Sequence, residues 1–265
     1  MYKKIKSIIR MGFKDAVAYR FHFYITLITS PLQLLIYYFL WKAIFSYSEQ
    51  EIINGFTFEL MISYYALNMI IAFFTWSGVE EWLEFDVRNG ELVNMLLKPF
   101  KVAYFYFFQI LGVNSLSIIL EMAPFFLIAV FFFGLKIAPV FYFLTFVISI
   151  VLAMILNFLI SYLVGMTAFW FNRIGGIRRV KRATVVFLSG GMIPLTFFPI
   201  AFQKIFNYLP FQYIRFVPIN IYLGNYPYLK VLIMIGIQIT WILILYAIAE
   251  FVWYKAFKKF AGAGA

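Results

Sequence analysis

Residues Pro139–Phe171, PVFYFLTFVISIVLAMILNFLISYLVGMTAFWF, form a long stretch without a charged residue. A helix needs about 20 mostly apolar residues to cross the hydrocarbon core of a bilayer, so this stretch predicts a transmembrane helix. Continuous helix over its whole length would measure about 50 Å and would have to tilt or project beyond the bilayer. The sequence therefore predicts an all-α integral membrane protein.

The composition of the whole chain points to the same class. Hydrophobic residues make up 65% of the 265 residues and charged residues 12%, and the mean hydropathy is +0.91. Soluble domains are about half apolar and about a quarter charged. We therefore expect residues 1–265 to form one transmembrane domain of six spans, with no soluble domain and no cleavable signal peptide.

On both sides of residues 139–171, apolar and polar runs alternate along the chain. The third crossing is expected at about 112–134, with the apolar residues before it near the interface. The glycines and prolines of SGGMIPLTFFP, residues 189–199, interrupt the fifth span and predict re-entrant or outer helices before the sixth. The predicted segments are an amphipathic interfacial helix (1–22), spans one and two (23–78), a cytoplasmic helix segment (79–100), spans three and four (101–171), a basic loop (172–183), and span five, outer helices, span six and a basic tail (184–265).

The basic residues predict the orientation of the chain. Seventeen of the 22 lysines and arginines lie in the first 20 residues, in 88–101, in 173–182 and in 255–259. Cytoplasmic loops carry such an excess, so both termini are expected in the cytoplasm of a multi-pass protein of the cell membrane. Orientation and contact with anionic lipids account for the net charge of +11. No nucleic-acid partner is needed.

Several classes of site are excluded by missing residue types. The chain has no cysteine and a single histidine, His22, so disulfides, thiolate metal sites and histidine-based triads are not expected. No metal and no catalytic residue is predicted.

The acids are concentrated in the segment 79–100, VEEWLEFDVRNGELVNMLLKPF. Five of the eleven Asp and Glu residues lie within residues 80–91. On a helix, Val79, Trp82, Leu83 and Val87 form an apolar arc, while three glutamates lie opposite and Glu84 and Arg88 are placed to pair. Gly90 is a natural stop. The acidic face is either a solvated interfacial surface or a docking surface for another protein.

The motifs in their order resemble those of type-2 ABC transporter permeases. RNGELVNMLLKPF (88–100) resembles the segment after the second span in a branch of that family, and SGGMIPLTFFP, LPF (209–211) and Pro218 before IYLG resemble its fifth-span region and outer helices. The ending FAGAGA is similar to its Phe/Tyr-x-x-x-Gly tail. With the six-span pattern, the resemblance covers essentially the whole chain.

The resemblance implies a transmembrane subunit driven by a separate ABC ATP-binding subunit. No G-x-x-x-x-G-K-[ST] motif occurs, since Gly175-Gly176 is followed by Ile-Arg-Arg. ATP and magnesium are therefore expected on the partner, with no cofactor on this chain. A second permease chain, the same or related, is implied. Arg178 and Arg179 would form a second cytoplasmic contact, and the coupling helix would use Glu80, Glu81, Trp82, Glu84, Phe85, Asp86, Arg88, Gly90 and Glu91.

For a few residues inside the predicted spans, more than one role is possible. Glu121 is an acid within a span, which is costly in a bilayer. It would either hydrogen-bond Asn114, Asn157 or Ser161 or serve a function, whereas Glu250 is expected to pair with Lys255 or reach the interface. Ser161 and Gly165 are placed to pack a helix within the chain or between chains. Because the resembled family lines its pathway with spans one, two and five, candidate pathway residues are Tyr64, Tyr65, Asn68, Phe73, Phe197 and Phe198.

The sequence thus favours the permease subunit of an ATP-driven exporter with an amphipathic, lipid-like or drug-like substrate. An aromatic, uncharged pathway suits such a cargo better than an ion. Two other classes stay open: an ion-coupled secondary transporter and a membrane-embedded enzyme. A secondary transporter usually shows paired broken helices and midplane charges, and an enzyme needs a convergent set of reactive side chains.

Overall fold

The computed structural model describes residues 2–18, 20–98, 100–171 and 173–262. Pro99 of the Leu-Leu-Lys-Pro segment and the last residues of the Phe-x-x-x-Gly tail lie outside the described residues. Within the described ranges the chain is helical, and its extended structure is limited to an isolated bridge between Ile53 and Phe56. This confirms the predicted all-α class.

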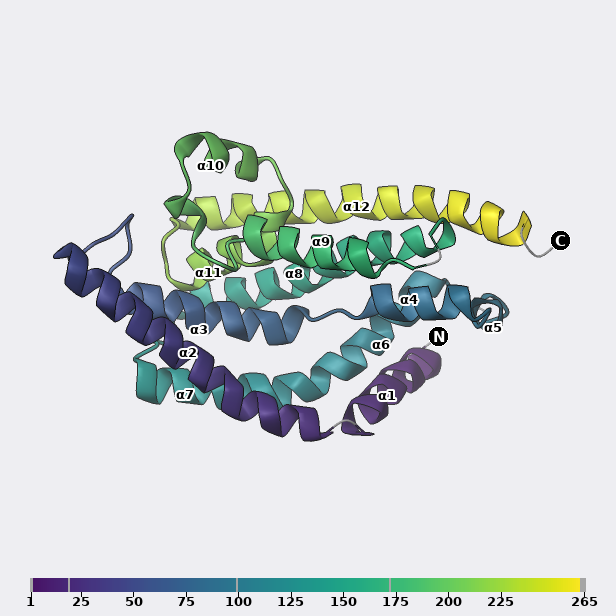
Figure 1. Ribbon diagram of the computed structural model, residues 1–265, viewed down its shortest axis with the longest axis horizontal. Helices are drawn as coiled ribbons and strands as arrows, with labels where there is room; N and C mark the ends of the chain where they lie inside the picture. The colour runs from purple at the N-terminus through teal and green to yellow at the C-terminus, as the bar shows by residue number, and fades with distance from the viewer. Residues whose placement is uncertain (1, 19, 99, 172, 263–265) are drawn as a thin grey trace.

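Among the described residues, five helical stretches are long and apolar enough to cross a membrane. They run side by side along the long axis of the molecule (Figure 1). The first two are Phe23–Ser48 in α2 (Arg20–Ser48), and Phe58–Arg88 across α3 (Phe58–Thr75) and α4 (Val79–Arg88). The third, Val102–Phe133, runs across α6 (Val102–Ser117), η1 (Ile118–Met122) and α7 (Ala123–Phe133). The last two are Val140–Phe169 across α8 (Val140–Met166) and η2 (Thr167–Phe169), and Tyr228–Lys259 in α12 (Tyr228–Gly262).

The third crossing differs from the sequence expectation. Residues expected near the interface are already part of one helical path, which runs from Val102 to Phe133 and bends at η1, a π-helical turn. Pro124 follows directly, and because proline has no N–H and its ring clashes with the preceding turn, the ordinary hydrogen-bond register cannot continue there. Gly134, with a φ of +70°, ends the path in the left-handed conformation that suits glycine.

The predicted basic loop 172–183 is mostly helix in the structure, and this expectation was wrong. Residues Gly175–Leu188 form α9, which carries four of the five basic residues of that segment. Its 14 residues span about 21 Å, less than the roughly 30 Å of a bilayer core. The path then breaks at Ser189–Gly191, where Gly190 has a φ of +80°.

Short helices follow the break, at the end of the bundle opposite to α4 and α5 (Leu92–Leu96) (Figure 1). The start of α1 and the end of α12 lie at the end that carries α4 and α5. Both ends of the described chain therefore lie on one side of the bundle. The short helices are η3 (Leu195–Phe197), α10 (Ile200–Asn207), η4 (Phe211–Ile214) and α11 (Phe216–Tyr222).

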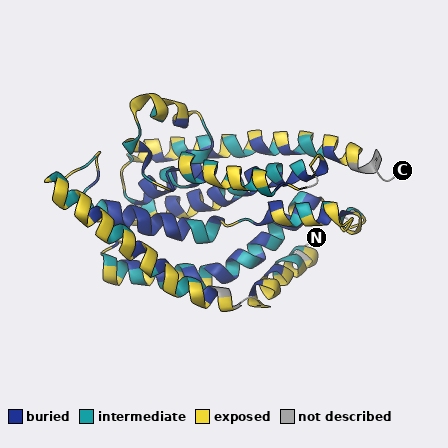
Figure 2. Cartoon of the chain, in the orientation of Figure 1, coloured by how far each residue is buried: buried dark blue, intermediate teal, exposed yellow. Residues whose placement is uncertain are grey.

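The core lies along α3 and α8, whereas α2 and α12 present apolar residues outward (Figure 2). On α3 a continuous run from Met61 to Ile71 is buried. On α2 and α12, by contrast, Ile36 is 67% and Leu243 is 63% exposed. Apolar faces of this extent need a lipid or protein neighbour.

The amphipathic helix α1 (Tyr2–Ala18) does not lie apart from the bundle but packs tightly along the first half of α6. A Cβ atom on Gly12 would approach the carbonyl oxygen of Gln109 to 2.2 Å, and one on Gly112 would approach the carbonyl oxygen of Ile9 to 2.1 Å. The two backbones therefore touch, and this approach requires glycine on both helices.

We predict that Gly112→Val separates α1 from α6. The added side chain would overlap the backbone of α1, and overpacking of this kind typically costs about 1–3 kcal/mol. The midpoint of thermal unfolding in lipid nanodiscs should fall by several degrees. The control is Gly236→Ala on α12, where an added Cβ would meet no atom within 4 Å. An unchanged midpoint for Gly112→Val would contradict the close crossing.

Candidate functional site

Two amide side chains bind the last carbonyls of α3 and so fix the turn that leads into α4. Asn114 on α6 donates to the carbonyls of Phe74 at 2.9 Å and Trp76 at 3.1 Å, and Asn157 on α8 donates to the carbonyl of Thr75 at 2.8 Å. The last carbonyls of a helix have no partner within it and need one from elsewhere, above all in a membrane. The turn from α3 into α4 is thus fastened to two other helices.

α4 packs against α8 through a small residue. A Cβ on Gly165 would lie 3.1 Å from Cα of Glu80 and 3.2 Å from a methyl group of Leu83. Val79 and Leu83 are fully buried, as the predicted apolar arc requires. Of the two alternatives for Ser161 and Gly165, the structure therefore shows packing within the chain.

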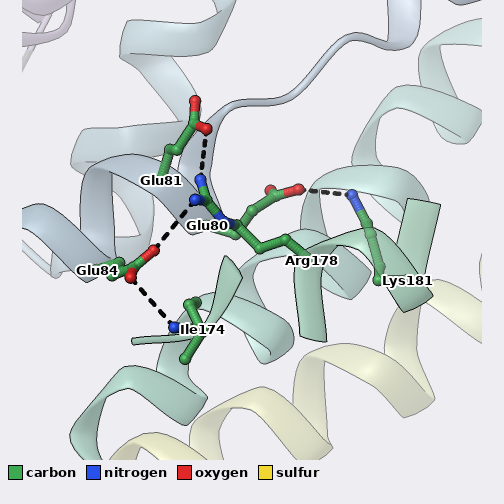
Figure 3. A network of polar contacts seen from close by, with 6 residues as sticks. All are labelled: Glu80, Glu81, Glu84, Ile174, Arg178 and Lys181. Atoms are coloured by element: carbon green, nitrogen blue, oxygen red, sulfur yellow. Dashed lines mark hydrogen bonds and ion pairs between the residues drawn. The ribbon is translucent and has the colours of Figure 1, made fainter. Parts of the chain in front are cut away.

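The glutamates of α4 face the basic side chains of α9 (Figure 3). Lys181 Nζ lies 3.0 Å from Glu80 Oε1. Arg178 lies between the other two glutamates, 2.5 Å from Glu81 Oε1 and 3.4 Å from Glu84 Oε2. The side chains of Glu80 and Lys181 are each 12% exposed, so this pair is shielded from water.

Two further hydrogen bonds complete this cluster. The second oxygen of Glu84 accepts from the backbone N–H of Ile174, the residue that caps the start of α9, at 3.1 Å. A carboxylate there also complements the positive end of the helix dipole. Lys181 donates to Ser161 Oγ on α8 at 2.6 Å. The cluster therefore joins α4, α8 and α9.

Asp86 holds the other side of α4, where it accepts a hydrogen bond from the hydroxyl of Tyr106 on α6. Glu80 and Asp86 are each 9% exposed. Glu80, Glu84 and Asp86 therefore do not form an open acidic face, and their coupling role stays a prediction. The expected Glu84–Arg88 pair is replaced by Glu84–Arg178, and Arg88 is exposed.

What α4 and α5 present outward is an apolar tip, defined as Phe85, Val93 and Leu97, which are 54%, 48% and 80% exposed. The same segment also exposes the polar residues Glu81, Arg88, Asn89 and Glu91, while Trp82 is partly buried against Trp76. α4 ends at Arg88, and Gly90 adopts a φ of +77°, as expected of a stop signal. Arg179, the other predicted contact, is exposed on α9.

Three of the candidate pathway residues clamp the break after α9. Tyr64 donates to the carbonyl of Gly190 at 2.7 Å, Tyr65 to that of Met192 at 3.0 Å and Asn68 to that of Gly191 at 2.8 Å. Arg215, before α11, donates to Asn68 Oδ1 at 2.7 Å. All three α3 side chains are buried, so they hold irregular backbone in place in this conformation.

The three phenylalanine candidates have different aromatic partners. Each makes its nearest edge-to-face contact with a different ring, with centroid distances of 4.9 to 5.8 Å. The pairs are Phe73 with Phe125, Phe197 with Trp41, and Phe198 with Phe187.

The two acids within predicted spans have different surroundings. Glu121 is buried at 6% exposure in the π-helical turn η1, while the amides of Asn114 and Asn157 donate to α3. Glu250 pairs with Lys101 at 2.9 Å, so of its two expected alternatives the pair with Lys255 is wrong. The hydrogen bond that Lys101 donates to Glu250 raises the pKa of Lys101 above its ordinary value, against a smaller lowering by desolvation.

Sequence reasoning missed Lys181, Tyr106 and Ile174 as partners of the α4 acids. The spacing of Arg178 and Lys181, three residues apart, would place both on one face of a helix. That signal was lost because the segment was interpreted as a loop.

We predict that the buried pair stabilises the fold far more than the exposed one. Glu80→Gln leaves Lys181 without its carboxylate in a shielded site, and breaking such a pair costs about 3 kcal/mol or more. Glu81→Gln, at a side chain that is 65% exposed, should cost at most about 1 kcal/mol. Denaturant unfolding in mixed micelles measures both. Adding Lys181→Met should restore stability to Glu80→Gln, and equal losses for the two single variants would contradict the assignment.

Comparison with known proteins agrees with this architecture. The model of the family described as ABC-2 family transporter protein matches residues 32–264. Comparison with curated proteins gave no match. The family match covers every long helix except the first turns of α2. The chain therefore belongs to the ABC-2 transporter family, the membrane-spanning permeases of ABC transporters.

Proposed function

We propose that the chain is the permease subunit of an ATP-driven exporter and that a separate ATP-binding subunit grips the α4–α5 segment. The observation that carries the proposal is the apolar tip, Phe85, Val93 and Leu97, exposed at the end of a helix whose acids are otherwise occupied. Apolar anchors surrounded by polar residues are typical of a protein interface. ATP and magnesium bind to the partner subunit.

The attachments of α4 support a coupling role. It is joined to α8 at Gly165, to α9 through Glu80, Glu81 and Glu84, and to α6 through Asp86. A push on the tip would therefore move these helices together rather than bend α4 alone. Since packed cores pass on displacement instead of absorbing it, the motion would reach the break after α9.

That break is where we place the gate of the transport pathway. α9 leads directly into Gly190 and Gly191, whose carbonyls are held by Tyr64 and Asn68 on α3. A displacement of α9 against α3 would strain these hydrogen bonds and open the contact between the two helices. The aromatic side chains around the break suit an amphipathic, lipid-like or drug-like substrate.

The same proposal places six passes of the chain across the cell membrane, with both termini in the cytoplasm. It is supported by the position of the start of α1 and the end of α12 on the side of α4 and α5 (Figure 1). An even number of passes requires α9 and the broken segment after it to serve as the fifth, although α9 alone is short. Irregular backbone is tolerated at such depth where protein satisfies it, as the clamp at Gly190 does.

A second permease chain, identical or related, would complete the transporter. The outward apolar faces of α2 and α12 are wide enough to contact both lipid and a neighbouring chain. Pairing would place two gates side by side, each driven through its own α4–α5 segment. Membrane lipids cover the remainder.

The test of coupling is the loss of the ATP-binding partner when the apolar tip is altered. Tagged chain from its native host should purify with a stoichiometric soluble protein that carries the G-x-x-x-x-G-K-[ST] motif. Leu97→Ser should reduce the amount bound about 30-fold, since anchors of this kind contribute about 2 kcal/mol or more.

Tyr208→Ser, at a side chain of similar exposure (81%) at the opposite end of the bundle, is the matched control and should leave binding unchanged. If the wild-type chain purifies alone even after gentle crosslinking, the coupling proposal fails. Ion-driven transport would then be the next class to test.

A further inference from the structure

A cavity of about 610 Å³ lies at the end of the bundle opposite to α4 and α5. Segments distant in the sequence form its walls: the α2–α3 turn, the end of α10, the η4–α11 region and the first turns of α12. The lining residues are Asn54, Gly55, Phe56, Thr196, Asn207, Gln212, Tyr213, Phe216, Asn220, Asn225, Tyr226, Lys230, Met234 and Ile237.

The composition of the lining is unusual for this chain. Five carboxamide side chains, those of Asn54, Asn207, Gln212, Asn220 and Asn225, converge on one cavity of a protein that is 65% hydrophobic. Each amide offers both donors and an acceptor. The described lining residues include one cation, Lys230, and no carboxylate.

Several of these amides are held in place by the backbone. Gln212 and Asn220 are each 5% exposed. Gln212 donates to the carbonyl of Asn207 at 3.1 Å, Asn220 donates to the carbonyl of Phe216 at 2.8 Å, and Asn225 donates to Asn220 Oδ1 at 2.8 Å. Their orientations are therefore set before any ligand arrives, which lowers the entropy cost of binding.

Asn54 is presented by a tight turn. Ile53 and Phe56 exchange two backbone hydrogen bonds, of 2.9 and 3.0 Å, and Asn54 and Gly55 between them have φ angles of +49° and +85°. An Asn-Gly pair with positive φ at both residues is the favoured sequence for this turn. The turn places Asn54 in the lining of the cavity.

Aromatic rings complete the lining. Phe56 and Tyr213 are buried in the wall, and Phe216 and Tyr226 are partly buried. Lys230 lies over the ring of Tyr226, with Nζ 4.6 Å from the centroid. Gln238 holds the backbone of one lining residue in place, because it donates to the carbonyl of Tyr213 at 2.9 Å.

We infer that this cavity is a binding site for a sugar, as a free saccharide or as the glycan headgroup of a larger molecule. Amides that donate and accept hydrogen bonds match vicinal hydroxyl groups, and ring faces match the apolar C–H faces of a pyranose. Lys230, without a carboxylate in the described lining, favours neutral or anionic sugars over amino sugars. As a step in export, which rests on the proposed function, the site would receive the headgroup of the cargo on the exit side.

The binding itself can be tested without ATP or the partner subunit. The full chain is placed in phosphatidylcholine nanodiscs and transferred out of any maltoside detergent, whose headgroup is itself a sugar. Saturation-transfer NMR is then recorded with glucose, galactose, mannose, rhamnose, N-acetylglucosamine and glucuronate at millimolar concentrations, a range in which weak binding is detected. At least one sugar should receive saturation from the protein.

The first variant is Asn54→Gly, which keeps the positive-φ turn and removes the amide. It should weaken binding about three- to tenfold, the effect of one neutral hydrogen bond. Asn89→Ala, at an exposed amide at the other end of the molecule, should bind as the wild type does. Lys230→Met should reduce binding of glucuronate and leave neutral sugars unchanged.

Absence of saturation transfer to every sugar would overturn the inference, as would equal binding by the wild type and Asn54→Gly. Stronger binding of tetra-alanine than of any sugar would make the cavity a peptide site and would also overturn it. None of these outcomes bears on the partner subunit, so a failure here and a failure of the coupling proposal are distinguishable.

Discussion

The ion pairs between α4 and α9 are the interaction on which the arrangement of the helices at the α4–α5 end of the bundle depends. Glu80 and Lys181 are largely shielded from water, and Arg178 joins Glu81 to Glu84. A buried charge without its partner costs several kcal/mol. Since each helix supplies the charges that the other requires, α4 and α9 must keep their positions relative to one another.

Close backbone approach provides the rest of the framework. Apolar side chains gain little by leaving lipid for each other, so helices in a membrane associate through tight packing and hydrogen bonds. Gly12 and Gly112 allow α1 to touch α6, and Gly165 allows α4 to touch α8. The amides of Asn114 and Asn157 then satisfy the carbonyls that α3 leaves unpaired.

These contacts connect the two ends of the molecule. The acids of α4 hold the first half of α9, and the hydroxyl and amide groups of α3 hold the glycines that follow it. α9 is therefore fastened at both ends to the α3–α4 unit. Beyond the glycines, the chain folds into the short helices that help to line the cavity, so a shift of α9 would also displace part of the cavity wall.

The sequence by itself determined the membrane class, the all-α fold, the positions of four of the five long helical stretches and the helix from Val79 that ends before Gly90. These features follow from local properties, namely the length of apolar runs, helical periodicity and the conformational freedom of glycine. The apolar arc of Val79 and Leu83 was predictable for the same reason. The family resemblance rested on motifs that are likewise local.

Only the tertiary structure decided which partners the charged and polar side chains have. Glu84 lies four residues from Arg88 yet pairs with Arg178, and Glu250 pairs with Lys101 instead of nearby Lys255. The sequence also did not predict which amides line one cavity, since Asn54 and Asn225 lie far apart in the chain. Such pairings depend on which helices pack together, and that is set by the summed contacts of the whole bundle rather than by the spacing of residues within any one segment.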